Sequence, residues 1–190
     1  MKLNNIEHIT TDKQTDIYIC DILKENSRRL SEKTTESELL NYIFGKTIDL
    51  QHTAEGKPFI NEAGVNISIS HSRNKLCIAL DKNKTIGVDI EELHPRLERV
   101  KEKFLPIKRR KEALPLITLA AYWSAIEALY KVAGEKAGAI GENIVFATNI
   151  IGRKNEKTTA KIADKNYELE IVEITSEYEI VVAWECMRTY

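Results

Sequence analysis

Several residue types that mark specialised protein classes are scarce in this chain of 190 residues. It has only three cysteines, Cys20, Cys77 and Cys186, which are widely spaced and form no C-x-x-C pair. Neither a zinc ribbon nor a redox motif is therefore predicted, and we expect reduced thiols in the cytosol. No apolar run is long enough to span a membrane, and the first residues lack the apolar stretch of a signal peptide. We therefore expect a cytoplasmic protein with no membrane partner.

An excess of charge of either sign is also missing. The chain has 28 Lys and Arg residues against 29 Asp and Glu residues, a formal net charge of -1. Nucleic-acid binders usually carry a clear basic excess, so nucleic acid is not expected as a partner. Hydrophobic residues make up 43% and charged residues 30%, which is typical of a folded globular protein. The length predicts one domain or two small lobes.

The first half of the chain shows one helical pattern followed by three strand patterns. Apolar residues recur at helical spacing over 27–44, and Gly45 is a helix stop signal. Strands are predicted over 66–71, 76–80 and 86–91 because apolar residues alternate or run together there. The polar turn 81–85 predicts that the last two strands form an antiparallel hairpin.

The second half begins with a charged segment, 92–112, expected to be a helix and a connector. A strong helix is predicted from Leu116 to Ala133, ending at Gly134, because its apolar residues form one stripe. A turn at Gly138 and Gly141 precedes strand patterns near 144–147, 158–163, 167–174 and 178–184. The order of helices and strands predicts an α+β fold in two halves.

Two carboxylates stand out in the strand pattern Val88-Asp89-Ile90-Glu91. Side chains alternate along a strand, so Asp89 and Glu91 are expected on the same face. Neighbouring carboxylates repel one another, and Mg²⁺ prefers such oxygen ligands. The alternative is a solvated outer face of an antiparallel sheet, and the motif alone leaves both possibilities open.

The long helix offers Glu127 and Lys131, which lie on one face at i,i+4 spacing. One interpretation is a surface ion pair worth a few tenths of a kcal/mol. The other is a ligand site, because the small residues Ala120, Ser124 and Ala128 on that face would leave room.

Two further segments carry a cation or a titratable group. His71 ends a strand, where it would either donate to a phosphate or lie at the surface. Gly56-Lys57-Pro58 places a cation on a rigid turn and otherwise looks like an ordinary loop.

The combination and order of these motifs is more specific than any one of them. Gly-Lys-Pro, Ser-His-Ser, Gly-Val-Asp-Ile-Glu and Trp-Ser-x-x-Glu-Ala-x-x-Lys follow one another between Gly56 and Lys131. This series resembles the 4′-phosphopantetheinyl transferases, in particular their monomeric, surfactin-type branch. The resemblance implies two similar halves related by pseudo-two-fold symmetry, each a small, mainly antiparallel sheet with helices. The expected lobes are 1–93 and 94–190, with the active site in the cleft between them.

The resemblance also implies a reaction. The phosphopantetheine arm of coenzyme A would move to a serine of an apo acyl or peptidyl carrier protein, releasing 3′,5′-adenosine bisphosphate. Such an enzyme is a holo-[acyl-carrier-protein] synthase that uses Mg²⁺. By the family motif, Asp89, Glu91 and Glu127 would hold the metal, and the catalytic residues would be Glu127, Lys131 and Asp89. Coenzyme A would be bound by Lys57, Pro58, His71, Ser72 and Lys131.

The chain departs from the family pattern beside the helix glutamate. Ile126 stands where the family usually has a lysine, and we expect it to join the apolar stripe. The basic run Lys108-Arg109-Arg110-Lys111 would be either a docking rim for an acidic carrier protein or a solvated surface. The sequence therefore favours a monomeric enzyme. The alternative is a catalytically degenerate family member that binds coenzyme A or a carrier protein without efficient transfer.

Overall fold

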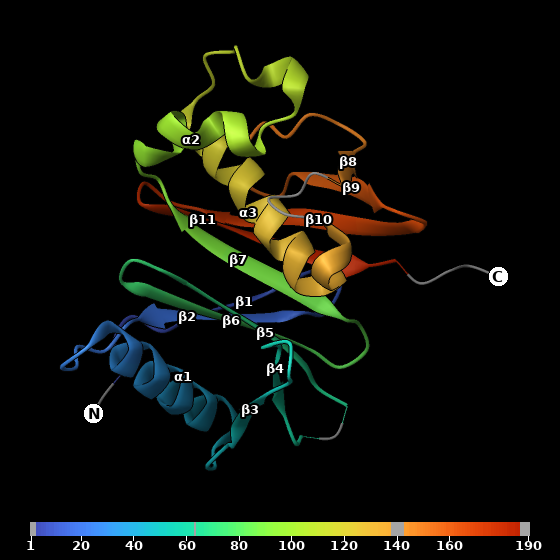
Figure 1. Cartoon of the computed structure of the whole chain (residues 1–190). Coiled ribbons are helices and arrows are strands. Elements are labelled where there is room, and N and C mark those ends of the chain that lie inside the picture. The colour runs from blue at the N-terminus through green and yellow to red at the C-terminus, as the bar shows by residue number, and fades with distance from the viewer. Residues whose placement is uncertain (1–2, 63, 138–142, 187–190) are drawn as a thin grey trace. The chain divides into compact units, whose positions relative to one another are not determined.

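The computed structural model describes residues 3–62, 64–137 and 143–186 (Figure 1). Within these residues the chain forms three α-helices and three antiparallel sheets, so the predicted α+β class is confirmed. The helices are α1 (Arg28–Phe44), α2 (Arg96–Phe104) and α3 (Leu116–Ala133). The strands are β1 (Glu7–Thr10), β2 (Asp16–Asp21), β3 (Leu50–His52), β4 (Pro58–Ile60), β5 (Asn66–Ser72), β6 (Lys75–Asp81), β7 (Ile86–Glu92), β8 (Ile144–Phe146), β9 (Lys157–Ile162), β10 (Lys165–Ile174) and β11 (Tyr178–Glu185).

The chain divides into two units, Met1–Lys84 and Thr85–Tyr190. This boundary lies before β7, whereas the sequence predicted it between residues 93 and 94. The difference arises because β7 pairs with β11, near the C-terminal end of the second unit. The expected turn at Gly138 and Gly141 lies outside the described residues.

The predicted hairpin between β6 and β7 is wrong. Strand β6 pairs with β5 and β2, so the tight hairpin of the first unit is formed by β5 and β6. Strand β7 instead forms its ladder with β11. The short polar turn 81–85 therefore joins two sheets rather than two neighbouring strands.

The first unit is built on a sheet with the strand order β1-β2-β6-β5, beside the small hairpin β3-β4. Helix α1 begins after Ser27, whose hydroxyl accepts a hydrogen bond from the Leu30 N–H. It ends at Gly45, whose φ of 65° is one that glycine adopts without strain. The helix buries Leu39 and Leu40 in one apolar cluster with residues of β6 and β5. Both predicted ends of this helix are confirmed.

The second unit is built on a sheet with the strand order β7-β11-β10-β9-β8. Helix α3 packs on β7 and β11, and α2 packs against α3. The contact includes Phe104 of α2 and Trp123 of α3, whose rings lie 5.4 Å apart edge to face. Tyr130 of the predicted apolar stripe is 45% exposed, so it lies off the buried face of α3, which continues to Val132.

The three cysteines are free thiols, and burial raises the pKa of Cys20 to about 12. A thiol with such a pKa stays protonated and unreactive near neutral pH. In the described part of the chain, no helix is long and apolar enough to cross a membrane.

Candidate functional site

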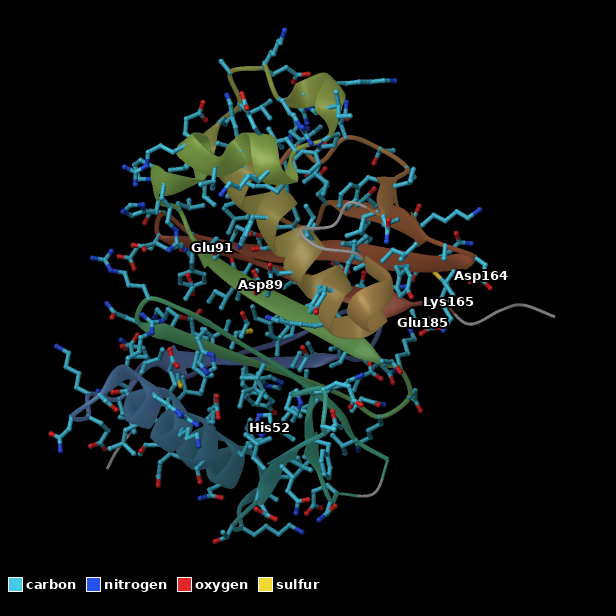
Figure 2. The ribbon with its side chains drawn as sticks, in the orientation of Figure 1. His52, Asp89, Glu91, Asp164, Lys165 and Glu185 are labelled. Carbon is cyan, nitrogen blue, oxygen red and sulfur yellow. The ribbon has the colours of Figure 1, made fainter. Side chains whose placement is uncertain are left out.

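The carboxylates of β7 lie on the face of the sheet that α3 covers (Figure 2). Gly87, Asp89 and Glu91 share this face because strand side chains alternate. A Cβ atom built on Gly87 would lie 2.0 Å from the Ala128 carbonyl oxygen of α3, so only glycine permits this close approach. Ala128 is fully buried in this contact between α3 and β7. The close packing buries both Asp89 and Glu91.

Lys131 connects the last turn of α3 to β7. Its ammonium group donates hydrogen bonds to the Val88 carbonyl oxygen at 2.8 Å and to Asp89 Oδ1 at 2.9 Å. The ion pair of Lys131 in the described residues is thus with Asp89, not with Glu127 on its own helix. Two of the residues predicted to act together are brought into direct contact.

Glu127 lies one turn before Lys131 and is half-buried. Burial raises the pKa of its carboxyl, and the negative charge of Asp89 raises it further. The positive charge of Lys131 opposes this effect in part, and Glu91 adds a weaker repulsion. The three carboxyls predicted as metal ligands therefore influence one another electrostatically.

Glu91 has a partner that the sequence did not reveal. Arg96 Nη2, from the first turn of α2, lies 2.6 Å from Glu91 Oε1. Burial raises the pKa of Glu91, although the hydrogen bond and charge of Arg96 lower it and Asp89 raises it. The only sequence signal for this pair is the spacing of five residues across the start of a helix.

A fourth acid, Glu179 of β11, lies beside the carboxyls of Asp89 and Glu91. Its Cα atom is the ladder partner of Glu91 across the two strands, and its side chain is 0% exposed. Burial, above all, raises the pKa of Glu179 well above its ordinary value; nearby Ser124 lowers it, and Asp89 and Glu91 raise it. The only sequence signal for Glu179 is that it is the one charged residue in the apolar strand pattern 178–184, and the sequence prediction did not include it.

The fit of these residues to Mg²⁺ can be tested on their chemistry. Carboxylate oxygens are the ligands that Mg²⁺ prefers, and a bound cation would relieve the carboxylate repulsion that adds to burial in raising the pKa of Glu127 and Glu91. In residues 3–62, 64–137 and 143–186, however, no three His, Cys, Asp or Glu side chains are arranged to hold a metal ion. Lys131 and Arg96 supply positive charge to Asp89 and Glu91 instead. The donor set fits the metal, and binding would require these side chains to re-orient.

Four of the five predicted coenzyme A residues lie in the first unit, and the fifth, Lys131, lies in the second. His71, near the end of β5, places Nε2 2.8 Å from Oε1 of Glu36 on α1. Lys57 is exposed in the turn that leads into β4, and Pro58 is the first residue of that strand. Ser72 is buried at the end of β5. A single site formed by these residues together with the carboxylates of the second unit stays a prediction.

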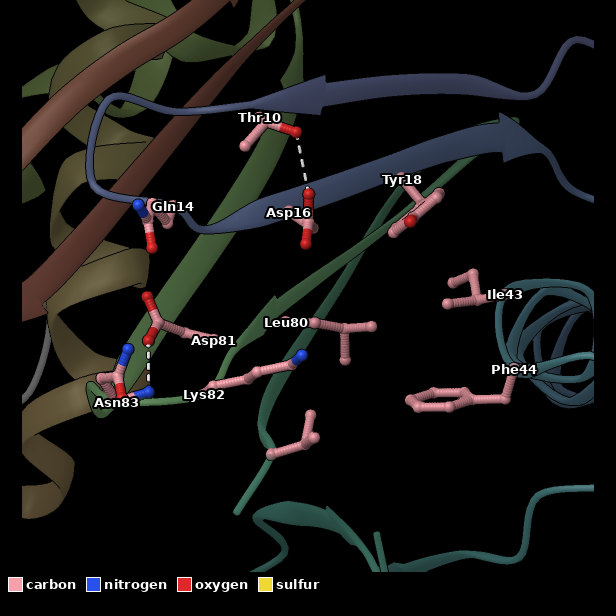
Figure 3. A pocket seen from close by; sticks show the side chains of 11 residues that line it. Thr10, Gln14, Asp16, Tyr18, Ile43, Phe44, Leu80, Asp81, Lys82 and Asn83 are labelled. Atoms are coloured by element: carbon pink, nitrogen blue, oxygen red, sulfur yellow. Dashed lines mark hydrogen bonds between the residues drawn. The ribbon is translucent and has the colours of Figure 1, made fainter. Parts of the chain in front are cut away.

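The first unit also contains a cavity of about 320 Å³ (Figure 3). Ile43 and Phe44 at the end of α1 lie on one side of it, and Tyr18 and Asp16 of β2 lie on another. Asp16 accepts a hydrogen bond from the Thr10 hydroxyl at 2.8 Å. None of the residues predicted to bind coenzyme A lines this cavity.

The basic run of the second unit is partly engaged in structure. Arg109 donates to Glu112, to the Tyr122 hydroxyl and to the Ile150 carbonyl oxygen. Arg110 donates to the Leu105 carbonyl oxygen. Lys108 and Lys111 are exposed, so only part of the run presents charge to a partner.

Comparison with known proteins adds no assignment: no protein-family model matches the chain, and no significant match is found among curated proteins.

Proposed function

We propose that this protein is a 4′-phosphopantetheinyl transferase, a holo-[acyl-carrier-protein] synthase. It would transfer the phosphopantetheine arm of coenzyme A to a serine of an apo carrier protein. The observation that carries the proposal is the contact between Lys131 of α3 and Asp89 of β7, with Nζ 2.9 Å from Oδ1. These residues come from two separate motifs of the series that resembles the family, and Glu127, from the second motif, is coupled to them by charge.

The reaction requires positive charge near the phosphates of coenzyme A and a base near the serine hydroxyl of the carrier protein. Asp89, Glu91 and Glu127 would hold Mg²⁺, which would act as a Lewis acid that offsets the negative charge of the pyrophosphate. Lys131 adds electrostatic stabilisation at the leaving phosphate. Glu127, half-buried beside Asp89 and Lys131, is the candidate base for removal of the serine proton.

The residues of the first unit would bind coenzyme A. The carboxylate of Glu36 lies 2.8 Å from the His71 ring, and the imidazole would meet a phosphate of coenzyme A. Ser72 adjoins it in sequence, and exposed Lys57 beside Pro58 would lie near the adenosine end. Each unit contains an antiparallel sheet with a helix packed on it, which supports the pseudo-symmetric family fold as part of the proposal.

The departure at Ile126 bears on the alternative, a member that binds without transfer. Ile126 is 3% exposed and belongs to the apolar core of the second unit. An apolar side chain thus packs into the core at position 126, where the family usually has a charged lysine. Because Asp89, Glu91, Glu127 and Lys131 are all present, we favour the active enzyme over the binding module.

Incubation of the protein with Mg²⁺, coenzyme A and a panel of apo carrier proteins tests the function. We expect one carrier to gain the mass of a phosphopantetheine arm, and chelation of the metal to abolish the gain. Glu127→Gln should lose at least 100-fold of the transfer rate with an unchanged circular dichroism spectrum. Binding of coenzyme A without any transfer would favour the alternative. Full activity of Glu127→Gln would remove Glu127 from the mechanism.

A further inference from the structure

Glu179 is a buried acid that the proposed reaction does not use. It is the second residue of β11, where the neighbouring residues Tyr178 and Ile180 are also buried. Burial of an ionised carboxyl is costly unless a cation or hydrogen-bond donors compensate it. In the described residues neither oxygen of Glu179 has a hydrogen-bond partner. The structure therefore presents a polar group whose partner has to be explained.

The surroundings of Glu179 are those of the candidate metal ligands. It lies across the ladder from Glu91, so both side chains are on the face that α3 covers. Ser124 of α3 faces it, and the Ser124 hydroxyl is likewise without a hydrogen-bond partner among the described residues. Ser124 lies about one turn before Glu127 on the same helix. The unpartnered carboxyl of Glu179 is thus the most deeply buried member of the acidic group.

The charges of this group do not balance. Among the described residues, the four carboxyls Asp89, Glu91, Glu127 and Glu179 lie together, and the cations that pair with them are Lys131 with Asp89 and Arg96 with Glu91. If all four were ionised, the excess would be two negative charges, which one divalent cation neutralises.

We propose that Glu179 is a fourth acidic residue of the divalent-cation site. It would act as a positioning residue that supplies negative charge and a hydrogen-bond acceptor at the most buried part of the site. The inference rests on the proposed function, because that function supplies the metal. It adds a residue that none of the recognised motifs contains.

Glu170 on β10 provides a matched control. It is also a buried glutamate in the same sheet, but its ladder partner is Val182, which faces away from the side of Glu91 and Glu179. Its Oε2 lies 3.7 Å from Lys157 Nζ, so a cation of the chain already accompanies it. A change at Glu170 therefore removes a buried carboxyl without touching the acidic group.

The test is Mn²⁺ binding by the full-length protein without coenzyme A. Electron paramagnetic resonance would measure free Mn²⁺, and the melting temperature would be followed in parallel, because a ligand of the folded state raises it. We expect Glu179→Gln to weaken Mn²⁺ binding at least tenfold, Glu170→Gln to leave it unchanged, and Glu179→Asp to restore part of it. Circular dichroism of each variant would establish its fold, and Glu179→Asp replaces Glu179→Gln as the test variant if the latter does not fold.

Unchanged Mn²⁺ affinity in the folded test variant would overturn the inference, as would an equal loss in Glu170→Gln. Absence of Mn²⁺ binding by the unmodified protein would overturn it as well. The proposed function is judged separately by carrier modification. A protein that modifies its carrier while Glu179→Gln binds Mn²⁺ normally would refute the role of Glu179 and leave the function standing.

Discussion

Asp81 in the first unit and Glu179 in the second are both buried carboxyls, but their surroundings differ. Asp81 is 3% exposed, and its oxygens accept hydrogen bonds from the Thr15 hydroxyl at 2.6 Å and from two backbone N–H groups at 2.8 Å. Glu179 has no such donors among the described residues and lies beside other acids. A satisfied buried carboxyl stabilises a turn, whereas buried carboxyls that repel one another indicate a site for a ligand.

The largest effect is expected where α3 approaches β7. Gly87→Ala should reduce the free energy of unfolding of the second unit by about 3 kcal/mol, because the new methyl group meets the Ala128 backbone. Both tryptophans, Trp123 and Trp184, lie in this unit, so urea unfolding followed by tryptophan fluorescence reports on it. Gly45→Ala in the first unit is the control, with an expected loss of about 1 kcal/mol for its positive φ. Equal losses would contradict the close helix–strand approach.

The comparison of the two buried carboxyls can be tested by replacing each with an amide. Asp81→Asn should cost about 2 kcal/mol, because it disturbs three hydrogen bonds to a charged acceptor. Glu179→Gln should change the metal-free stability by less than about 0.5 kcal/mol or raise it, because it removes an unpaired acid. Denaturation followed by circular dichroism checks both variants. A loss at Glu179 as large as that at Asp81 would show that the two carboxyls have the same structural role.

A change of pH is expected to have a smaller effect on the free energy of unfolding of the metal-free protein. The pKa values of Glu91 and Glu127 are raised above the ordinary value of 4.5 in the folded protein. The folded state then binds more protons than the unfolded state, so metal-free stability should fall as pH rises from 4.5 through these raised values. Tryptophan-monitored unfolding at several pH values checks this trend. Glu127→Gln should flatten it, and a stability that rises over this range would contradict the predicted direction.

The smallest effects on the free energy of unfolding are expected for two ion pairs whose arginine is exposed. Arg28→Ala should cost about 0.3–0.5 kcal/mol, because its pair with Glu32 is a surface i,i+4 contact. Arg96→Ala should cost more, about 1 kcal/mol, because its partner Glu91 is buried and loses a cation. Paired thermal and urea denaturation would resolve the two. Equal losses would argue that Glu91 does not depend on Arg96.

Local sequence patterns predicted the helices well. The limits of α3 are those predicted, because an apolar stripe and a terminal glycine are encoded within the segment itself. The ends of α1 follow from Ser27 and Gly45 for the same reason. The resemblance assigned Asp89 and Lys131 to one active site, and the structure joins them in an ion pair that their sequence spacing did not predict.

Long-range pairing was not predictable in the same way. The turn 81–85 has the composition of a hairpin, but β7 pairs with a strand about ninety residues away. No local pattern specifies that partner, because strand pairing depends on which faces are buried in the folded unit. Glu179 was missed for the same reason, because it lies on β11, whereas the contact of Arg96 with Glu91 depends on how the chain turns from β7 into α2.

The pairing of β7 with β11 has a consequence for synthesis of the protein. Asp89 and Glu91 leave the ribosome long before Glu179, which lies close to the C-terminal end. The strand that carries the first two acids therefore waits without its ladder partner until β11 has been made. The acidic group, and any metal binding that depends on all four members, can form only after β11 has been synthesised. Nascent chains truncated before β11 should accordingly lack it.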